Sequence, residues 1–230
     1  KKEYRRQGIG SKLLTKLETY FKHMGRKKIA VAYFLPSCYA WYIPHTDNHD
    51  HPCAPGIRIN SNEYFFYLHR GYEPYNYQDA FHLNLVDYEI SDKIKEILNN
   101  NEKEGIQIEI YQPHKHYGLE EFCQKLNIYD FEKPYPFLVV SKNNQIVGWT
   151  GAMWNEESGR GHFDGIAILE EVRGKGLGQA LFSMLAYYNK MHGAKFMTFY
   201  TGLHNHARYI YMKAGFKIVM SYASMGKTFK

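Results

Sequence analysis

The sequence predicts a mixed α/β fold, in which helices flank a mostly antiparallel sheet and a partial repeat precedes a complete one. The first observation is a glycine-rich phrase that occurs twice, as Arg5-Arg6-Gln7-Gly8-Ile9-Gly10 and as Arg173-Gly174-Lys175-Gly176-Leu177-Gly178. The second is that apolar residues recur at helical spacing after each phrase. The third is that each predicted helix stops at a glycine, Gly25 or Gly193, before a strand-like run.

The partial repeat is expected to span residues 1–86. Its predicted elements are a helix at 8–24, a strand at 27–34, a helix near 60–70 and a strand near 77–85. Residues 87–104 are polar and carry Ile90, Ile94 and Leu98 on one face, which predicts a linking helix.

The complete repeat is expected to span residues 105–230. A strand at 106–111 and a helix at 118–126 come first, and strands at 136–140 and 145–153 then flank a predicted hairpin turn at Lys142-Asn143-Asn144. The remaining elements are a strand at 163–169, the helix after the second glycine phrase, a strand at 194–201, a helix from Asn205 and a closing segment at 216–229.

Glycines at the start of a helix let backbone N–H groups close around phosphate, and the unpaired amides and the helix dipole favour negative charge. Each phrase therefore predicts a pyrophosphate cradle. A P-loop is excluded because Ser11 and Gln179, and not a Lys-Ser or Lys-Thr pair, follow the last glycines. A dinucleotide fold is disfavoured because neither copy has its glycine spacing directly after a strand.

On these residues the chain resembles the GNAT superfamily of acyl-CoA-dependent N-acyltransferases, whose pyrophosphate loop reads Q/R-x-x-G-x-G/A. The second copy is also flanked by segments that resemble the family's neighbouring strands and helix. Residues 163–169 resemble its fourth strand, 195–200 its fifth, and Asn205 to Phe216 is similar to its N-x-x-A-x-x-x-Y-x-K-x-G-F helix. The resemblance implies a GNAT-like fold, and the repeat implies a tandem-GNAT protein.

The resemblance also implies acetyl-CoA as co-substrate and a set of residues that bind it. They are Ile166, Ala167 and Ile168 on the fourth strand, then Arg173, Gly174, Lys175, Gly176, Leu177, Gly178 and Gln179 in the loop, and Asn205. Only the N–H of Leu177 is assigned, and Asn205 also suits a helix cap. Tyr211 matches the register of the family's general acid, with a packing role as the alternative.

The general base is expected to be Asp164 on the fourth strand, or an ordered water in its place. His114, His116 and Tyr117 lie between the first strand and helix, where the family often builds its acceptor wall, and are assigned as substrate contacts. Trp149 and Trp154 are expected to line the core or a pocket.

The first copy departs from the pattern, because Ser61 stands where the second copy has Asn205 and the chain begins at the loop itself. A truncated first repeat is therefore expected. Landmark spacing places an insertion at 36–59, which holds Cys38, His45, Asp47, His49, Asp50, His51 and Cys53. Their spacing fits no common zinc pattern, so no metal is assigned and a solvated loop or interdomain contact is preferred.

Composition agrees with a globular chain and limits its partners. The net charge is +6, but lysines and arginines are interspersed with carboxylates, so no nucleic-acid partner is expected. The sequence has no apolar run that would predict a membrane span or a signal peptide, so no membrane partner is expected. Its three scattered cysteines do not resemble a disulfide framework, and a cytoplasmic location is expected. Two readings remain: an N-acetyltransferase acting on an amine of a small molecule or peptide, and a non-catalytic acyl-CoA-binding or scaffold protein.

Overall fold

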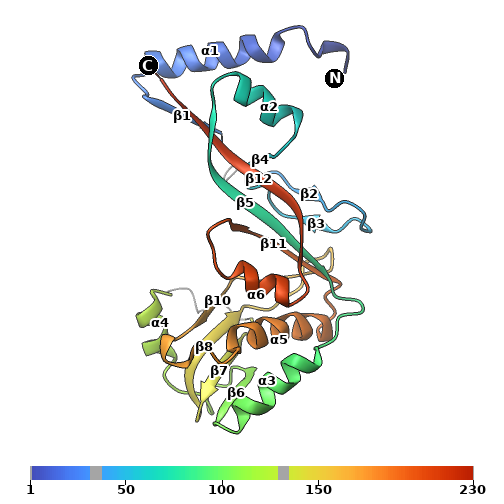
Figure 1. Ribbon diagram of the computed structural model, residues 1–230, viewed down its shortest axis with the longest axis vertical. Helices are drawn as coiled ribbons and strands as arrows, with labels where there is room; N and C mark the ends of the chain where they lie inside the picture. Colours follow the sequence, from blue (N-terminus) through green and yellow to red (C-terminus); the bar gives the residue numbers. More distant parts are fainter. Residues whose placement is uncertain (1, 32–37, 129–134, 230) are drawn as a thin grey trace. The chain divides into compact units, whose positions relative to one another are not determined.

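The computed structural model, which describes residues 2–31, 38–128 and 135–229, divides into two compact units (Figure 1). Unit 1 consists of residues 1–40, 52–78 and 220–230, and unit 2 of residues 41–51 and 79–219. Both units are discontinuous in sequence: residues 41–51 belong to unit 2, and strands β5 (Glu73–Asn84) and β12 (Lys217–Thr228) each contribute residues to both units. The division into successive repeats joined by a linker stays a prediction.

Unit 1 is a small sheet with two α-helices. Strand β12 pairs antiparallel with β1 (Lys28–Val31) and with β4 (Ile57–Arg58). Helix α2 (Asn62–His69) is capped by Ser61, whose Oγ accepts a hydrogen bond from the Tyr64 amide at 3.1 Å. The short 3-10 helix η1 spans Lys2–Tyr4, and the last part of the predicted first strand, 32–34, lies outside the described residues.

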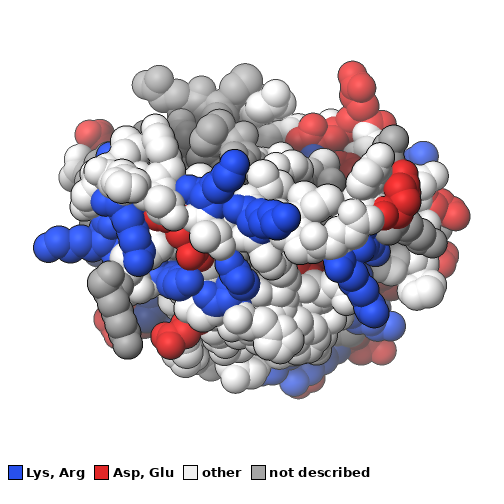
Figure 2. Space-filling view, turned by 90° about the horizontal axis from the view of Figure 1, so that it is seen from above, with Lys and Arg blue, Asp and Glu red and all other residues white. Residues whose placement is uncertain are grey.

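Helix α1 (Ile9–His23) follows the first glycine phrase, and only Leu14 of it is buried. Leu13 is 64% exposed, and the same face continues with Leu17, Tyr20 and Met24. Figure 2 shows one face on which lysine and arginine side chains lie among neutral ones. The helical spacing is thus as predicted, but the apolar face is mostly exposed within this unit.

Unit 2 contains an antiparallel four-stranded sheet in the order β10-β8-β7-β6. Its strands are β6 (Ile106–Ile110), β7 (Leu138–Lys142), β8 (Gln145–Gly151) and β10 (Gly165–Ile168). Asn143 and Asn144 join β7 to β8 with positive φ angles of 50° and 69°, which confirms the predicted tight turn. A second group of strands has β11 (Phe196–Gly202) between the short β9 (Arg160–Gly161) and β5.

Five helices complete unit 2 among its described residues: α3 (Asp92–Glu102), α4 (Leu119–Leu126), the short η2 (Glu170–Val172), α5 (Leu177–Met191) and α6 (Arg208–Lys213). Helix α5 is the central one, with eight buried residues that include Leu181 and Phe182. Helix α3 packs against α5 and buries Ile94, so the segment predicted as a linker is part of the core of unit 2.

Residues 41–51 of the predicted insertion form a hairpin, with β2 (Trp41–Tyr42) paired to β3 (Asp50–His51), and belong to unit 2. The His49 ring stacks on Phe196 at 3.8 Å between centroids, and its Nδ1 lies 2.9 Å from Nε2 of His82. His51 is fully buried and His49 half-buried, whereas Pro44, His45, Asp47 and Asn48 are exposed, so only part of this segment is a solvated loop. Its rings pack as apolar surface, which sequence composition did not reveal.

The mixed α/β fold with mostly antiparallel sheets is confirmed. Among the described residues, no helix combines the length and the apolarity needed to cross a lipid bilayer.

Candidate functional site

The second glycine phrase forms the turn that starts α5. Gly176 caps the helix with φ 75° and ψ 2°, a left-handed conformation that favours glycine, and Gly174 also has a positive φ of 84°. A Cβ at Gly176 would lie 3.0 Å from Ile97 of α3. The backbone therefore favours glycine there, and a larger residue would require the Ile97 side chain to shift. The first amides of α5 are left without helical partners.

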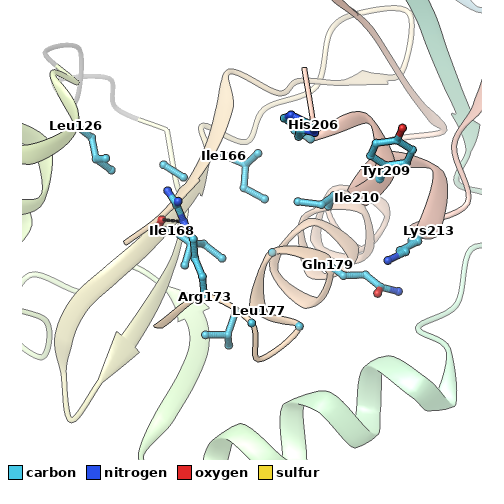
Figure 3. A pocket seen from close by; sticks show the side chains of 15 residues that line it. Leu126, Ile166, Ile168, Arg173, Leu177, Gln179, His206, Tyr209, Ile210 and Lys213 are labelled. Atoms are coloured by element: carbon cyan, nitrogen blue, oxygen red, sulfur yellow. Dashed lines mark hydrogen bonds between the residues drawn. The ribbon is translucent and has the colours of Figure 1, made fainter. Parts of the chain in front are cut away.

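A cavity of about 560 Å³ opens in front of these amides. Figure 3 shows Ile166 and Ile168 of β10 on one side of it and Ile210 of α6 on the other, with Arg173 at the loop. The complete lining is Leu126, Ile166, Ala167, Ile168, Arg173, Gly174, Gly176, Leu177, Gly178, Gln179, His206, Ala207, Tyr209, Ile210 and Lys213. An apolar cavity that is also lined by two cations and by free amides suits a molecule with an apolar arm and a phosphate group.

The strands beside the cavity explain why it exists. Strand β10 pairs with β8, whereas β11 pairs with β9, so β10 and β11 belong to different sheets although α5 connects them in sequence. Among the described residues, no strand pairs with β10 on the cavity side. Polar groups of that edge are available to a ligand.

Nine of the predicted cofactor residues line this cavity: Ile166, Ala167, Ile168, Arg173, Gly174, Gly176, Leu177, Gly178 and Gln179. Leu177 is 2% exposed, so its side chain packs inward and leaves its amide as the group near the loop. Arg173 donates from Nε to the carbonyl oxygen of Ile168 at 3.3 Å, the dashed line in Figure 3, and so ties the loop to β10.

Two predicted cofactor residues have other contacts. Lys175 pairs with the Glu104 carboxylate, and its carbonyl accepts a hydrogen bond from Asn101 at 3.1 Å, which anchors the loop to α3. Asn205 donates to Thr201 and accepts from the Ala207 amide at 3.0 Å, so its side chain holds the turn before α6. In this chain Asn205 lies two positions before Ala207, whereas the family pattern has three.

Tyr211, predicted as the general acid, is 4% exposed and lies within a cluster of rings. Its ring centroid is 4.6 Å from that of Phe182, 4.7 Å from Phe199 and 5.9 Å from Phe163. Burial raises the pKa of Tyr211 to about 12, so the phenol keeps its proton at neutral pH. The side chain faces the core beside the start of β10 and is not among the residues that line the cavity.

The predicted substrate contacts lie in the loop before α4. His116 is buried, its Nδ1 accepts from the Gln112 amide at 2.9 Å, and its Nε2 is 3.1 Å from Glu109. Although burial opposes it, hydrogen bonds from Lys115 and His116 lower the pKa of Glu109. His114 and Tyr117 are exposed, and none of the three predicted contacts lines the cavity.

Asp164, predicted as the base, is hydrogen bonded to a residue that the sequence analysis overlooked. His162 Nε2 lies 2.6 Å from Asp164 Oδ1, and the His162 ring stacks on Trp154 with 3.3 Å between centroids. An i, i+2 pair before a strand was a usable signal, since alternate residues of an extended chain share a face. The helical spacing of His206, Ile210 and Lys213 was a second overlooked signal, because these residues form one side of the cavity.

The sequence pattern of the acetyltransferase (GNAT) family matches residues 1–41 and 95–216, more than half of the chain. Among curated protein sequences, none matches.

Solved structures share the fold at low identity. A GCN5-related glucosamine N-acetyltransferase region in a fungal multi-domain beta-N-acetylglucosaminidase has 16% identity and a TM-score of 0.61, and the match covers 98% of this chain and 28% of that one. A GCN5-related N-acetyltransferase from Sphaerobacter thermophilus has 14% identity and a TM-score of 0.56, with 98% and 70% covered. A tandem GNAT protein from the clavulanic acid biosynthesis pathway has 12% identity and a TM-score of 0.55, and the match covers 98% of this chain and 71% of that one.

Proposed function

Because this chain belongs to the acetyltransferase (GNAT) family, we propose that it transfers an acetyl group from acetyl-CoA to an amine of a small molecule or peptide. The reaction is direct attack of the amine on the thioester in a ternary complex. The observation that carries the proposal is the cavity of about 560 Å³ that joins the α5 loop to the unpaired edge of β10.

The residues of the cavity divide by chemistry. The amides at the start of α5, with Arg173 and Lys213, suit the phosphates of coenzyme A. Ile166, Ile168 and Ile210 suit the pantetheine arm, and the peptide groups of β10 suit its amides.

Tyr211 is proposed to protonate the departing thiolate, since its phenol is neutral and lies beside the start of β10. A hydroxyl in a ring cluster is also consistent with packing alone. The two roles separate in a Tyr211→Phe variant, which keeps the ring and loses the hydroxyl.

A tandem arrangement is part of the proposal. It is supported by the match of the family pattern to both ends of the chain and by the equal backbone angles of the two glycine caps, Gly8 at φ 75° and Gly176 at φ 75°. The second repeat is proposed as the catalytic one, and the first as structural.

The test combines binding with turnover. Calorimetry with acetyl-CoA should give one site, and a panel of primary amines should release free thiol from acetyl-CoA in the presence of the chain. If the chain binds acetyl-CoA but no amine releases thiol, the alternative of a non-catalytic acyl-CoA-binding or scaffold protein replaces the enzyme. If acetyl-CoA does not bind, both readings fail.

A further inference from the structure

A cluster of polar and aromatic side chains lies just before β10, at the end of that strand that points away from the phosphate loop. Its members are Tyr135, Trp154, Glu156, Arg160, His162 and Asp164. None of them lines the cavity. All belong to unit 2.

The cluster is held to the four-stranded sheet by its backbone. The Asp164 amide donates to the Gly151 carbonyl at 3.1 Å, and the His162 amide donates to Trp154 at 2.9 Å. Between them, Phe163 packs against Phe182 and Tyr211 on the side of α5 and α6. Because neighbouring residues of an extended segment point in opposite directions, His162 and Asp164 face away from that side.

The hydrogen bond within the cluster fixes the state of the histidine. The Asp164 carboxylate only accepts hydrogen bonds, so the 2.6 Å contact requires the proton of the neutral His162 ring to be on Nε2. Nδ1 then carries the lone pair. The stack on Trp154, which itself stacks on Tyr135 at 4.5 Å, holds the ring plane in place.

The surroundings of Nδ1 combine a carboxylate with a cation, since Nη2 of Arg160 lies 3.7 Å from Glu156 Oε1. The nearest carboxylate oxygen, Glu156 Oε1, is 3.9 Å from Nδ1, which is too long for a hydrogen bond. This oxygen also accepts from Trp154 Nε1 at 3.3 Å. A protonated amine between Nδ1 and Glu156 would be able to donate to both.

The position along the chain suits the reaction. His162 lies six residues before Ile168, which is next to the loop, and six residues of extended chain span at most roughly 20 Å. This is a span that an extended pantetheine arm can cover along β10. The thioester would then lie near Phe163, with Tyr211 on one side and His162 on the other.

We infer that His162 is the general base for the acceptor amine and that Asp164 is its positioning residue, an assignment that rests on the proposed acetyl transfer. Nδ1 of His162 takes one proton from the ammonium group of the acceptor, and the freed nitrogen lone pair attacks the thioester carbonyl carbon. The C–N bond forms, the C–S bond breaks and the thiolate is protonated by Tyr211. The second N–H proton of the adduct restores the phenol, and His162 releases its proton to water.

The protonation state agrees with this role. Burial lowers the pKa of His162 below its usual value, hydrogen bonding and charge from Asp164 and charge from Glu156 raise it, and Arg160 lowers it. The net result is a neutral imidazole at pH 7, as a base requires. Asp50 pairs with Arg160 at 3.4 Å and belongs to the same set of charges.

The kinetic test uses the whole chain and three variants. His162→Gln should lower kcat/KM for amine acetylation by roughly 100-fold or more, and Asp164→Asn by roughly 10-fold. The matched control is His192→Gln, because His192 is exposed and hydrogen bonded to its own helix; this variant should leave kcat/KM unchanged. Acetyl-CoA affinity by calorimetry should stay within roughly twofold in all three, since none of these residues lines the cavity.

The pH profile separates a base from a packing residue. In the wild type kcat/KM should fall on the acidic side as His162 gains a proton. Asp164→Asn should move that limb to lower pH, because the carboxylate raises the pKa of His162. His162→Gln should remove this acidic limb of the kcat/KM profile. Full activity in His162→Gln, or an unmoved limb in Asp164→Asn, would overturn the assignment.

If no amine is acetylated by the wild type, the proposed function fails, and nitrogen NMR of the ring then decides the assignment. Saturating acetyl-CoA should shift the His162 ring nitrogens and leave those of His192 unchanged. A His162 that is protonated at pH 7, or that does not respond to acetyl-CoA, overturns the placement of a base at the reactive end.

Discussion

The two glycine phrases give the molecule an internal comparison. The caps of α1 and α5 have nearly the same backbone, with φ 75° and ψ 1° at Gly8 and φ 75° and ψ 2° at Gly176. Their surroundings differ. A Cβ at Gly8 would meet no atom within 4 Å, whereas one at Gly176 would meet Ile97 at 3.0 Å.

The cavity of unit 2 is lined by the loop before α5, by β10 and by α6, whereas the one beside α1 is lined by Leu14, Leu17, Phe21 and β1, away from Gly8. The comparison teaches that the phrase supplies the amides, and that a lined cavity in front of them also requires a strand with an open edge and a facing helix.

The largest effect on acetyl-CoA affinity is expected at the second glycine phrase, the loop that follows β10. Gly176→Glu should reduce acetyl-CoA affinity by roughly 100-fold or more, because a side chain in a left-handed position strains the loop and a carboxylate repels the phosphates. Gly8→Glu should leave affinity unchanged. Calorimetry measures both, and circular dichroism checks that each variant folds. Equal losses in the two variants would contradict a single site in unit 2, and Gly176→Ala separates strain from charge.

The general-acid role is proposed for Tyr211 of unit 2. Tyr211→Phe should lower turnover by roughly 10-fold to 1000-fold and leave acetyl-CoA affinity almost intact, because the ring packing is kept and only the proton donor is lost. Thiol release under saturating acetyl-CoA measures this. A Phe variant with full activity would assign Tyr211 to packing in the cluster of Phe182 and Phe199.

The two helices should also differ in their contribution to stability. Leu181 of α5 is fully buried, so Leu181→Ala should lower the free energy of unfolding by about 2–5 kcal/mol. Leu13→Ala in α1 should change it by less than about 0.5 kcal/mol, since that side chain is 64% exposed. Urea titration of both variants tests the difference. A large loss in Leu13→Ala would mean that this face is covered in solution.

A smaller effect is expected from His82 and His49, two half-buried histidines of unit 2. Burial lowers the pKa of His82 to about 4, with a further decrease from the charge of His49, whose own pKa burial also lowers. Below the ordinary pKa of 6.5 the unfolded chain therefore binds more protons than the folded one, so stability is full above that pH and is lost as pH falls toward 4.

The melting temperature should drop by roughly a few degrees between pH 7 and pH 5. The His82→Gln variant should show a weaker drop, measured by differential scanning calorimetry. An unchanged slope in His82→Gln would assign the pH dependence to other groups.

Periodicity and turn chemistry were enough to predict α1, α5 and the Asn143-Asn144 turn, since each follows from neighbouring residues. Contacts between distant residues were not predictable in this way. The anchoring of the loop by Lys175 and Glu104 joins positions 71 residues apart, and the stack of His49 on Phe196 joins two segments further apart still.

For the site, the resemblance placed β10 and the loop at the cavity but not the partners of each side chain. Hydrogen bonds that occupy His116 and Asn205 depend on local geometry, and the ring cluster around Tyr211 brings together β11, α5 and α6. The His162–Asp164 pair was within reach, because its two members are neighbours on one face of an extended segment.

The division of β5 and β12 between the units has a consequence for synthesis of the chain. Unit 1 pairs Lys28 with Thr228 and Val31 with Met225, so its sheet closes only after nearly the whole of unit 2 has been made. Unit 2 has no such dependence on the last strand for its four-stranded sheet, which uses residues 106–168. Long-range pairing is slow, and chains fold as they emerge. On the ribosome β1 therefore waits longest for its partner strand, and expression yield should depend most on that segment.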